Sequence, residues 1–508
     1  MDTRNLRGVS CALLTSSERK EYLTEERGTE WDGETGNNYL VLSLQEKNVL
    51  LKGPQRTCDS PGFAYRKVVS AVKEQMDSLW HTTNIYRHPK LYEYVEKLAA
   101  KFPGDLKVVY LVNSGTEAND LAVLLARLYT GNSEILSLQG SYHGYSSGLM
   151  GLTSTQSYRA PLLAPSGFHH VPLPDPFRGA WGGCRDSPAQ APGACSCPGD
   201  CVATDNYIHQ LKQLLEHSVP VRGVAALFAE SIQGVGGTLQ FTKGYLKKAQ
   251  ELVKSYGGVY VADEVQTGFG RTGDHFWGFE GHGVTPDIVT LAKGIGNGFP
   301  LAAVVTTRDV AAAHARAAYF NTFGGNPLAS AAGKAVLEVI EEEKLQENCK
   351  VVGKYFIEKL KDLQARHSVI GDVRGKGLML GVELVTPGSK EPLDNSKVLD
   401  ILEATKDMGV LVGRGGKKNN VSIPESEALY LRTKYSTLLE PVVNALQFIA
   451  LDVVKASQHV KRILQLLKSH RDNPERVTDE IIKDATVVAE KVGLEEGITS
   501  MPRILARH

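Results

Sequence analysis

Along the middle of the chain, short strand-like runs that end in polar or glycine-rich turns alternate with longer stretches of apolar residues at helical spacing. Val259–Ala262 and Ile288–Leu291 are such runs, Lys107–Val112 and the run VRGVAALFAE resemble them, and Ala118–Tyr129 is rich in Leu and Ala at helical spacing. Alternation of short buried strands with helices is typical of parallel sheets. The pattern therefore predicts an α/β fold, with a mainly parallel sheet and helices on both of its faces.

The pattern changes after about residue 326. A helical stretch, ASAAGKAVLEVIEEEKLQ, precedes the strand-like run LMLGVELV, and from about Ala428 onward helical periodicity with frequent charges continues to the end. The first combination fits a smaller α+β domain, and the second fits a helical tail. We therefore expect an atypical N-terminal segment (1–65), a large domain (66–325) with a cysteine-rich insertion (176–203), a smaller α+β domain (326–416) and an unrelated helical tail (417–508).

Composition restricts the partners of this chain more than its fold. Its 508 residues, 42% of them hydrophobic, are enough for two or more domains with a large core. The 57 basic side chains balance the 57 acidic ones, so nothing indicates a nucleic-acid partner. No uninterrupted apolar run of about 18 residues occurs, and we expect no membrane span.

The first chemical signal is an acid and a lysine, each at the end of a predicted strand. Asp263 follows Val259–Ala262, and Lys293 follows Ile288–Leu291 and precedes a glycine-rich turn. Each residue alone has an ordinary explanation, since such an acid often caps a helix and such a lysine is often solvated. Together they match the needs of pyridoxal phosphate, which takes a lysine amine on its aldehyde and a carboxylate at its ring nitrogen. We predict that the two side chains meet at the carboxyl edge of the sheet.

A small-residue turn between a strand and a helix supplies a third part of such a site. Ser114, Gly115 and Thr116 follow Asn113 at the end of the predicted strand Lys107–Val112. Backbone N–H groups at a helix start bind anions, so this turn could hold the cofactor phosphate. The alternative is an ordinary helix cap with Glu117 in the first turn.

Several motifs then resemble one known family. LVNSGTEAND, SYHGYSSG, FAESIQGVGG, ADEVQTGFG, AKGIGNGFP, FNTFGGNP and DVRGKGLMLGVEL are similar to motifs of class III pyridoxal-phosphate-dependent aminotransferases of fold type I. The resemblance extends from about Arg66 to about Gly415. It implies that the large domain binds pyridoxal 5'-phosphate, that the chain forms a homodimer or tetramer with shared active sites, and that the protein is mitochondrial.

The resemblance also implies roles for further residues. Tyr142 and His143 occupy the position of an aromatic ring that stacks on the cofactor, although a Tyr between glycines also packs in turns. Gln266 matches a residue that hydrogen-bonds the ring hydroxyl, and Thr322 matches a threonine that reaches the phosphate of the neighbouring subunit. Glu230 matches a glutamate that manages substrate groups.

The implied reaction is a ping-pong transamination through a Schiff base on Lys293. Lys293 and Asp263 would be the catalytic residues, and the amino group would move from an amino acid such as alanine to an oxo acid, glyoxylate or pyruvate. Two alternatives stay open. One is a cofactor-binding protein without catalysis, and the other is a phospholyase, because relatives with the same core eliminate phosphate from amino-alcohol phosphates.

The alternatives rest on departures from the family pattern. Residues 1–65 lack the DGxxYLDFxSG and GHxHP motifs, and no RxxPP motif follows Lys417, where the family has an arginine for the substrate carboxylate. Arg414 and Arg432 stand in different contexts. Ser231 replaces a family proline. The tail weakly resembles a fragment of a hAT-type transposase-derived protein, which suggests a chimeric gene model.

Four of the seven cysteines lie in the insertion 176–203. Their spacing, C-x10-C-x-C-x3-C, differs from the usual zinc patterns, although four neighbouring thiolates could bind a metal. We expect reduced surface-loop thiols and no metal. These cysteines are Cys184, Cys195, Cys197 and Cys201.

The N-terminus gives little support for targeting. The first twenty residues include Arg4 and Arg7, but Asp2 and Glu18 do not fit the acid-poor pattern of a transit peptide. A mitochondrial location is therefore an implication of the resemblance, and a cytoplasmic one stays open.

Overall fold

The computed structural model describes the backbone of residues 39–44, 47–52, 65–159, 166–220, 223–315, 319–407, 412–416 and 420–422. The chain divides into two units, residues 1–60 and residues 61–508. The described part of the first unit is an antiparallel hairpin of β1 (Tyr39–Leu44) and β2 (Lys47–Lys52). Most of the predicted tail, including the part that resembles a transposase fragment, lies outside the described residues.

The second unit is built on a seven-stranded sheet with the order β3-β9-β8-β7-β6-β4-β5. Strands β4 to β8 run parallel to their neighbours within that group, and β9 pairs antiparallel with both β3 and β8. The sheet is therefore mainly parallel, as predicted. Its strands are β3 (Val108–Val112), β4 (Glu134–Leu138), β5 (Phe168–Val171), β6 (Val224–Glu230), β7 (Val259–Asp263), β8 (Ile288–Leu291) and β9 (Ala302–Thr306).

Both faces of this sheet are buried, and successive side chains of a strand pack on opposite faces. In β7, Val259 and Val261 pack in one hydrophobic cluster, whereas Tyr260 and Ala262 pack in another. A parallel sheet covered on both faces needs such continuously apolar strands, because neither face meets water. This explains why the strands read as unbroken apolar runs in the sequence.

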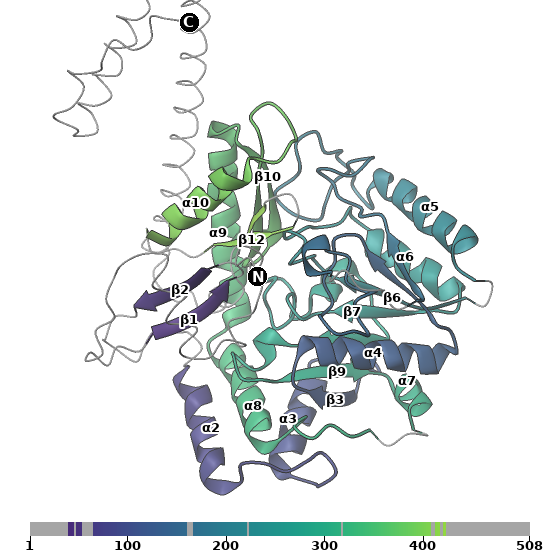
Figure 1. Cartoon of the computed structure of the whole chain (residues 1–508), viewed down its shortest axis with the longest axis vertical. Coiled ribbons are helices and arrows are strands. Elements are labelled where there is room, and N and C mark those ends of the chain that lie inside the picture. Colours follow the sequence, from purple (N-terminus) through teal and green to yellow (C-terminus); the bar gives the residue numbers. More distant parts are fainter. Residues whose placement is uncertain are drawn as a thin grey trace, which may run out of the picture. The chain divides into compact units, whose positions relative to one another are not determined.

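Helices cover the two faces. Helix α4 (Gly115–Thr130) and the short α7 (Arg308–Ala313) contribute to the cluster on one face, and α5 (Val202–His217) and α6 (Tyr245–Ser255) contribute to the cluster on the other (Figure 1). The remaining helices before the smaller sheet are α2 (Arg66–Ser78), α3 (Pro89–Ala99), α8 (Pro327–Glu342) and α9 (Leu345–Arg366), with 3-10 turns η3 (Gln156–Tyr158), η4 (Gly278–His282) and η5 (Lys293–Ile295).

A second, antiparallel sheet has the order β10-β11-β13-β12. Its strands are β10 (Ile370–Lys376), β11 (Met379–Leu384), β12 (Gly413–Gly415) and β13 (Asn420–Ser422), and α10 (Asn395–Asp407) lies between β11 and β12 in the chain. Apolar residues of α9 pack with those of β10 and β11 in one hydrophobic cluster. Because β13 belongs to this sheet, the sheet continues past residue 416, the predicted end of the smaller domain.

The cysteine-rich insertion packs against the large domain. Cys184 and Cys201 are 5% and 1% exposed and belong to its main hydrophobic cluster, and Cys195 and Cys197 pack partly buried against that cluster. None of the four forms a disulfide with another described residue. The expectation of surface-loop thiols is wrong for Cys184 and Cys201, because the loop folds back onto the start of α5.

The α/β fold with a mainly parallel sheet and a smaller α+β part is confirmed. The predicted boundaries at residues 66, 326 and 417 stay predictions. Among the described residues, no helix combines the length and apolar character that crossing a membrane requires.

Candidate active site

Asp263 is the last residue of β7, and its carboxylate is almost completely buried. Its Oδ2 accepts a hydrogen bond from Asn119 Nδ2 at 2.9 Å and lies 2.8 Å from His143 Nδ1. Its Oδ1 accepts from the backbone N–H of Val265 at 3.1 Å. Three donors from different parts of the chain therefore fix the carboxylate at the carboxyl edge of the sheet, where ligands of open α/β sheets bind.

The start of α4 lies beside the ends of the central strands. The Oγ of Ser114 accepts a hydrogen bond from the backbone N–H of Glu117 at 3.2 Å, so Ser114 caps the helix. A Cβ atom at Gly115 would lie 3.3 Å from Val265 Cγ2 and 3.5 Å from Ala292 Cβ. The helix start thus closely approaches the segments that follow β7 and β8, and a glycine permits that approach.

Thr116 ties this helix start to the turn that carries the aromatic motif. Its Oγ1 accepts a hydrogen bond from the backbone N–H of Tyr145 at 3.3 Å, and it packs against Gly144. Both hydroxyl residues of the turn thus have a structural role within the chain. The expectation that the turn holds a phosphate is compatible with these contacts, because a helix start retains N–H groups without intrahelical partners.

Lys293 begins the 3-10 turn η5 directly after β8 and Ala292. Its φ of 49° lies in the left-handed region, which is uncommon for a residue with a side chain. Such strain is concentrated at functional sites. Strand β8 is hydrogen-bonded to β7, with Thr290 opposite Asp263, so Lys293 follows the strand next to the carboxylate. The lysine side chain is exposed in the single chain.

Glu230 ends β6 and lies opposite Asp263 in the register of β6 and β7. Its Oε2 accepts from the backbone N–H of Gly234 at 2.8 Å, and its Oε1 accepts from that of Tyr142 at 3.4 Å. Burial raises the pKa of Glu230 to about 7, the nearby His143 opposes this increase and the charge of Asp263 adds to it. The site therefore holds a second buried carboxyl group beside Asp263, and burial favours the protonated form of Glu230.

Two further predicted residues lie in the loops around these carboxyl groups. The ring of Tyr142 lies 4.8 Å from the ring of Tyr158, centroid to centroid, and burial raises the pKa of Tyr142. The side chain of Gln266 lies against Gly234, where any larger residue would collide with it. Tyr142 and Gln266 thus lie in or against the loops whose backbone N–H groups donate to Glu230.

Thr322 lies in the segment before α8. It is exposed, in a segment whose neighbour Asn321 accepts from Asn113 Nδ2 at 3.1 Å. Asn321 Nδ2 also donates to Glu117 Oε2 at 3.2 Å. The segment is therefore attached to the start of α4, while Thr322 itself faces away from the protein interior.

Asn119, Glu264 and the hydrogen bond of Ser231 were not predicted from the sequence. Asn119 is a buried polar residue in the apolar face of α4, and its position among Ala and Leu was the available signal. Glu264 is buried and accepts from Ser231 Oγ at 2.5 Å and from the N–H groups of Gly278 and Phe279 at 2.7 and 2.8 Å. The serine that replaces a family proline thus has its own hydrogen bond.

These residues fit pyridoxal phosphate by the chemistry of their donor set. A buried carboxylate, a lysine amine after the adjacent strand and a helix start lie around one edge of the sheet. Within the described part of the chain, His143 Nε2 and Asn119 Oδ1 are buried without a hydrogen-bond partner. Buried polar atoms without partners are costly, and a polar ligand is one of the things that can satisfy them.

A buried charged cluster lies close to this site and joins three parts of the chain. Arg374 Nη1, on β10, donates to Asp372 Oδ2 at 3.0 Å and to Glu383 Oε2 at 2.6 Å. Its Nη2 donates to the backbone carbonyl of Gly237 at 2.8 Å. Gly237 lies in the loop that follows Glu230, the last residue of β6. The cluster therefore connects the smaller sheet to the loop that contacts Glu230 and Gln266.

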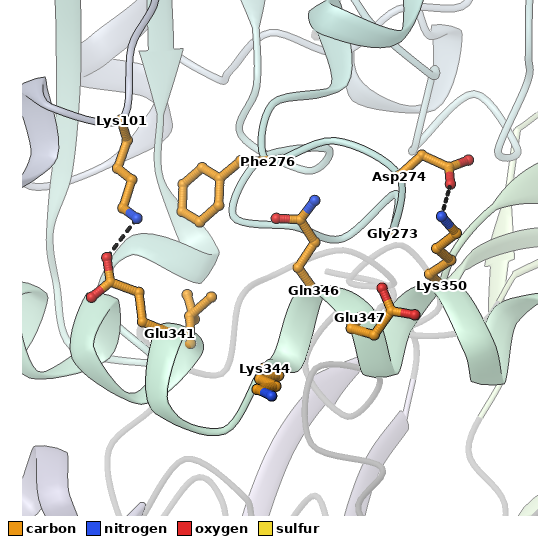
Figure 2. A pocket seen from close by; sticks show the side chains of 10 residues that line it. Lys101, Gly273, Asp274, Phe276, Glu341, Lys344, Gln346, Glu347 and Lys350 are labelled. Carbon is orange, nitrogen blue, oxygen red and sulfur yellow. Dashed lines mark ion pairs between the residues drawn. The ribbon is translucent and has the colours of Figure 1, made fainter.

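A pocket of about 440 Å³ lies elsewhere, between the loop before η4 and the junction of α8 with α9. Figure 2 shows Lys101 paired with Glu341 and Lys350 paired with Asp274 along its wall, at 2.5 Å and 3.2 Å. None of the predicted site residues lines it. The strand-end site is therefore defined by its side chains and not by this pocket.

Comparison with known proteins gives a consistent set of relatives. The family model described as aminotransferase class-III matches residues 55–429. The mitochondrial alanine–glyoxylate aminotransferase 2 of Homo sapiens is 53% identical over 361 residues, which cover 70% of this chain and 70% of that protein.

Two solved structures extend the comparison to the fold. A phospholyase from Arthrobacter in complex with phosphoethanolamine has a TM-score of 0.70 at 27% identity, over 84% of this chain and 99% of that chain. A PLP-bound amine transaminase from an uncultivated Pseudomonas species has a TM-score of 0.67 at 30% identity, over 76% and 87%.

Proposed function

The chain belongs to the class-III aminotransferase family and is a pyridoxal-phosphate-dependent transaminase, and from this premise we propose that an amino acid such as alanine is its amino donor and that glyoxylate or pyruvate is its acceptor. The observation that carries the proposal is the placement of Asp263 and Lys293 after adjacent strands, beside the start of α4. The printed name of the human relative, at 53% identity, supports the choice of substrates.

Lys293 and Asp263 have the two catalytic roles in this proposal. Pyridoxal 5'-phosphate, when bound, supplies an electron-accepting ring and an aldehyde that takes up the amino group. Lys293 Nζ would hold the cofactor by its aldehyde and, once released, would accept and return the α proton of the substrate. Asp263 holds a proton on the ring nitrogen, and His143 and Asn119 keep its carboxylate in position.

The remaining predicted residues bind and orient. Backbone N–H groups at Ser114, Gly115 and Thr116 bind the phosphate at the start of α4, where the helix dipole favours an anion. Tyr142 stacks on the ring, and Gln266 hydrogen-bonds the ring hydroxyl. Two more residues complete the assignment, namely Glu230 beside the substrate and Thr322 at the phosphate of the partner subunit.

We also propose a homo-oligomer, a dimer or tetramer, in which the segment of Thr322 completes the active site of a partner subunit. Phe320 and Phe323 beside it are 55% and 61% exposed in the single chain. The Phe323 ring lies 5.3 Å from that of His81, next to Trp80, which is 62% exposed. Large apolar side chains gathered on one surface support an interface there.

A mitochondrial location is part of the proposal. The human relative carries "mitochondrial" in its printed name, which supports this location. Subcellular fractionation of the tagged full-length chain tests the location. Recovery with cytosolic markers would contradict it.

Transfer of labelled nitrogen tests the substrates directly. The purified full-length protein with pyridoxal phosphate is incubated with ¹⁵N-alanine and glyoxylate, or with ¹⁵N-alanine and a second oxo acid, and the product amino acids are measured by mass spectrometry. We expect ¹⁵N-glycine and unlabelled pyruvate, and none from Lys293→Ala. Failure of alanine to donate to any oxo acid would contradict the proposed substrates.

The same preparation separates the two alternatives. Release of inorganic phosphate from phosphoethanolamine, without transfer from alanine, would favour a phospholyase, as the Arthrobacter structure is named. Cofactor binding without either reaction would favour a protein without catalysis. The higher identity to the aminotransferase than to the phospholyase, 53% against 27%, makes transamination the expected outcome.

A further inference from the structure

The four cysteines of the insertion bring their sulfur atoms together. The Sγ atoms of Cys184, Cys195, Cys197 and Cys201 all lie within 4.8 Å of one another. Cys195 Sγ is 3.4 Å from Cys201 Sγ and 3.5 Å from Cys197 Sγ. Thiols are weak hydrogen-bonding groups, so hydrogen bonds between them contribute little to bringing four sulfurs together.

The spacing of the sulfurs agrees with a tetrahedral metal site. Four sulfurs about 2.3 Å from one zinc ion lie about 3.8 Å from each other. A disulfide requires an S–S distance of about 2.05 Å, well below the observed separations. The four sulfurs are therefore close enough for one ion to contact all of them after small side-chain adjustments.

The position of Cys201 favours its thiolate form. Cys201 is the residue before the first turn of α5, where the helix dipole stabilises negative charge. Its sulfur accepts a hydrogen bond from the backbone N–H of Cys184 at 3.2 Å. Cys184 and Cys201 are also both hydrogen-bonded to the backbone of Lys243. Lys243 N donates to Cys184 O and Cys201 N donates to Lys243 O, both at 2.9 Å.

The segment between Cys184 and Cys201 connects the large domain to the smaller sheet. Arg185 Nη2 donates to Asp372 Oδ1 at 2.6 Å, and Lys376 pairs with Asp186 at 2.5 Å. Asp372 also binds Arg374, the residue at the centre of the buried charged cluster. Cys184 therefore lies directly before the residues that contact β10, and an ion bound to the four cysteines would hold this part of the loop in place.

We propose that Cys184, Cys195, Cys197 and Cys201 bind one structural Zn²⁺ ion. Four thiolate ligands in a tetrahedral arrangement select zinc over magnesium and calcium, which prefer oxygen. The site is closed, because all four positions around the ion are occupied by the protein, and closed sites are structural. Binding releases the thiol protons to solvent and leaves the oxidation state of sulfur and zinc unchanged.

Metal content is the first measurement. Full-length protein, purified without metal-affinity chromatography, is analysed for zinc and iron by mass spectrometry, and its cofactor content is measured in parallel. We expect about one zinc per chain, whether or not pyridoxal phosphate is bound. Absence of zinc after dialysis against zinc chloride, or iron in its place, would overturn the proposal.

Variants assign the metal to the cluster. Cys195→Ser/Cys197→Ser changes the two less buried ligands, and Cys349→Ser changes a buried free thiol outside the insertion. The double variant should lose its zinc and unfold at a lower temperature, while Cys349→Ser keeps its zinc. Zinc retained by the double variant would overturn the assignment.

The wild-type protein provides the test if the double variant does not fold. Its insertion thiols should react slowly with a thiol reagent until a zinc chelator is added, and replacement by Co²⁺ should give thiolate-to-cobalt charge-transfer bands. Equal thiol reactivity with and without chelator would contradict a bound metal.

Discussion

His143 Nδ1 lies 2.8 Å from Asp263 Oδ2, and both side chains are buried. The carboxylate accepts, so Nδ1 carries the hydrogen and the imidazole orientation is fixed. Asn119 Nδ2 donates to the same oxygen and also to the backbone carbonyl of His143. The three residues form one hydrogen-bonded unit that joins α4, β7 and the aromatic turn, and a rigid carboxylate is what the ring nitrogen of the proposed cofactor requires.

The first prediction concerns this unit. Asn119→Ala removes a donor to a charged group, which is worth about 1.5–3 kcal/mol, and should weaken binding of pyridoxal phosphate by roughly 10-fold to 100-fold. The affinity is measured by titrating the apoprotein with cofactor and following absorbance. Asn132→Ala is the matched control. Asn132 lies just after the C-terminal end of α4, and its Nδ2 donates to the backbone carbonyl of Val224. An equal loss in both variants would contradict a positioning role for Asn119.

A second prediction tests the shared active site. Lys293→Ala inactivates the site of its own chain, and Thr322→Ala should inactivate the site of the partner. Each variant alone should be almost inactive, but a mixed dimer contains one site with both residues intact. Co-expression of the two variants with different tags, followed by isolation of the mixed species, should restore up to about half of the wild-type activity per dimer. A mixed species as inactive as its parents would contradict the exchange of Thr322.

A third prediction follows from the raised pKa of Glu230. The folded protein, with a pKa of about 7 there, keeps this proton to a higher pH than the unfolded chain, whose value is near 4.5. The free energy of unfolding should therefore fall as pH rises from about 4.5 to about 7, by about 3 kcal/mol from this group. Glu230→Gln cannot lose a proton and should lack this contribution. Denaturant unfolding of both proteins without added cofactor, across that pH range, measures the difference.

Parallel stability curves for wild type and Glu230→Gln would contradict the raised pKa. A difference of the opposite sign, with wild type gaining stability as pH rises, would mean that Glu230 is stabilised as a carboxylate. In that case its backbone donors, Gly234 and Tyr142, would outweigh its burial.

A fourth prediction concerns the charged cluster between the two sheets. Arg374→Met removes the partner that Asp372 and Glu383 share, and breaking a buried pair on one side costs about 3–5 kcal/mol. The shift of the denaturant midpoint measures this loss. Lys67→Met is the control, since Lys67 pairs with Glu338 at 3.1 Å on the surface, where such pairs contribute at most about 1 kcal/mol. Equal midpoint shifts in both variants would contradict a larger contribution of the buried pair to stability.

The fold and the central site residues were predictable because their signals are local. Val259–Ala262 and Ile288–Leu291 are buried on both faces, which leaves a continuous apolar run in the sequence. A polar residue directly after such a run must lie at the edge of the sheet, and Asp263 and Lys293 do so. Similarity of the neighbouring motifs to class III aminotransferases then gave the remaining candidates, and the family is confirmed.

What could not be predicted depends on contacts between distant segments. In the sequence, Asn119 is a single polar residue in a predicted helix. Only the packing of α4 on the sheet places its Nδ2 2.9 Å from Asp263 Oδ2. The cysteine spacing is irregular, and the insertion has to fold back onto α5 before the four sulfurs meet. Arg374 likewise finds Gly237 only when the two sheets come together. Periodicity contains no information about such long-range pairs.

The most direct test of the account is the absorption spectrum of the full-length protein with pyridoxal phosphate, before and after alanine is added. We predict a visible band from cofactor bound to Lys293, which alanine shifts to the spectrum of the aminated cofactor and which Lys293→Ala lacks. A visible band that survives Lys293→Ala, or a wild-type band that alanine leaves unchanged, would contradict the account.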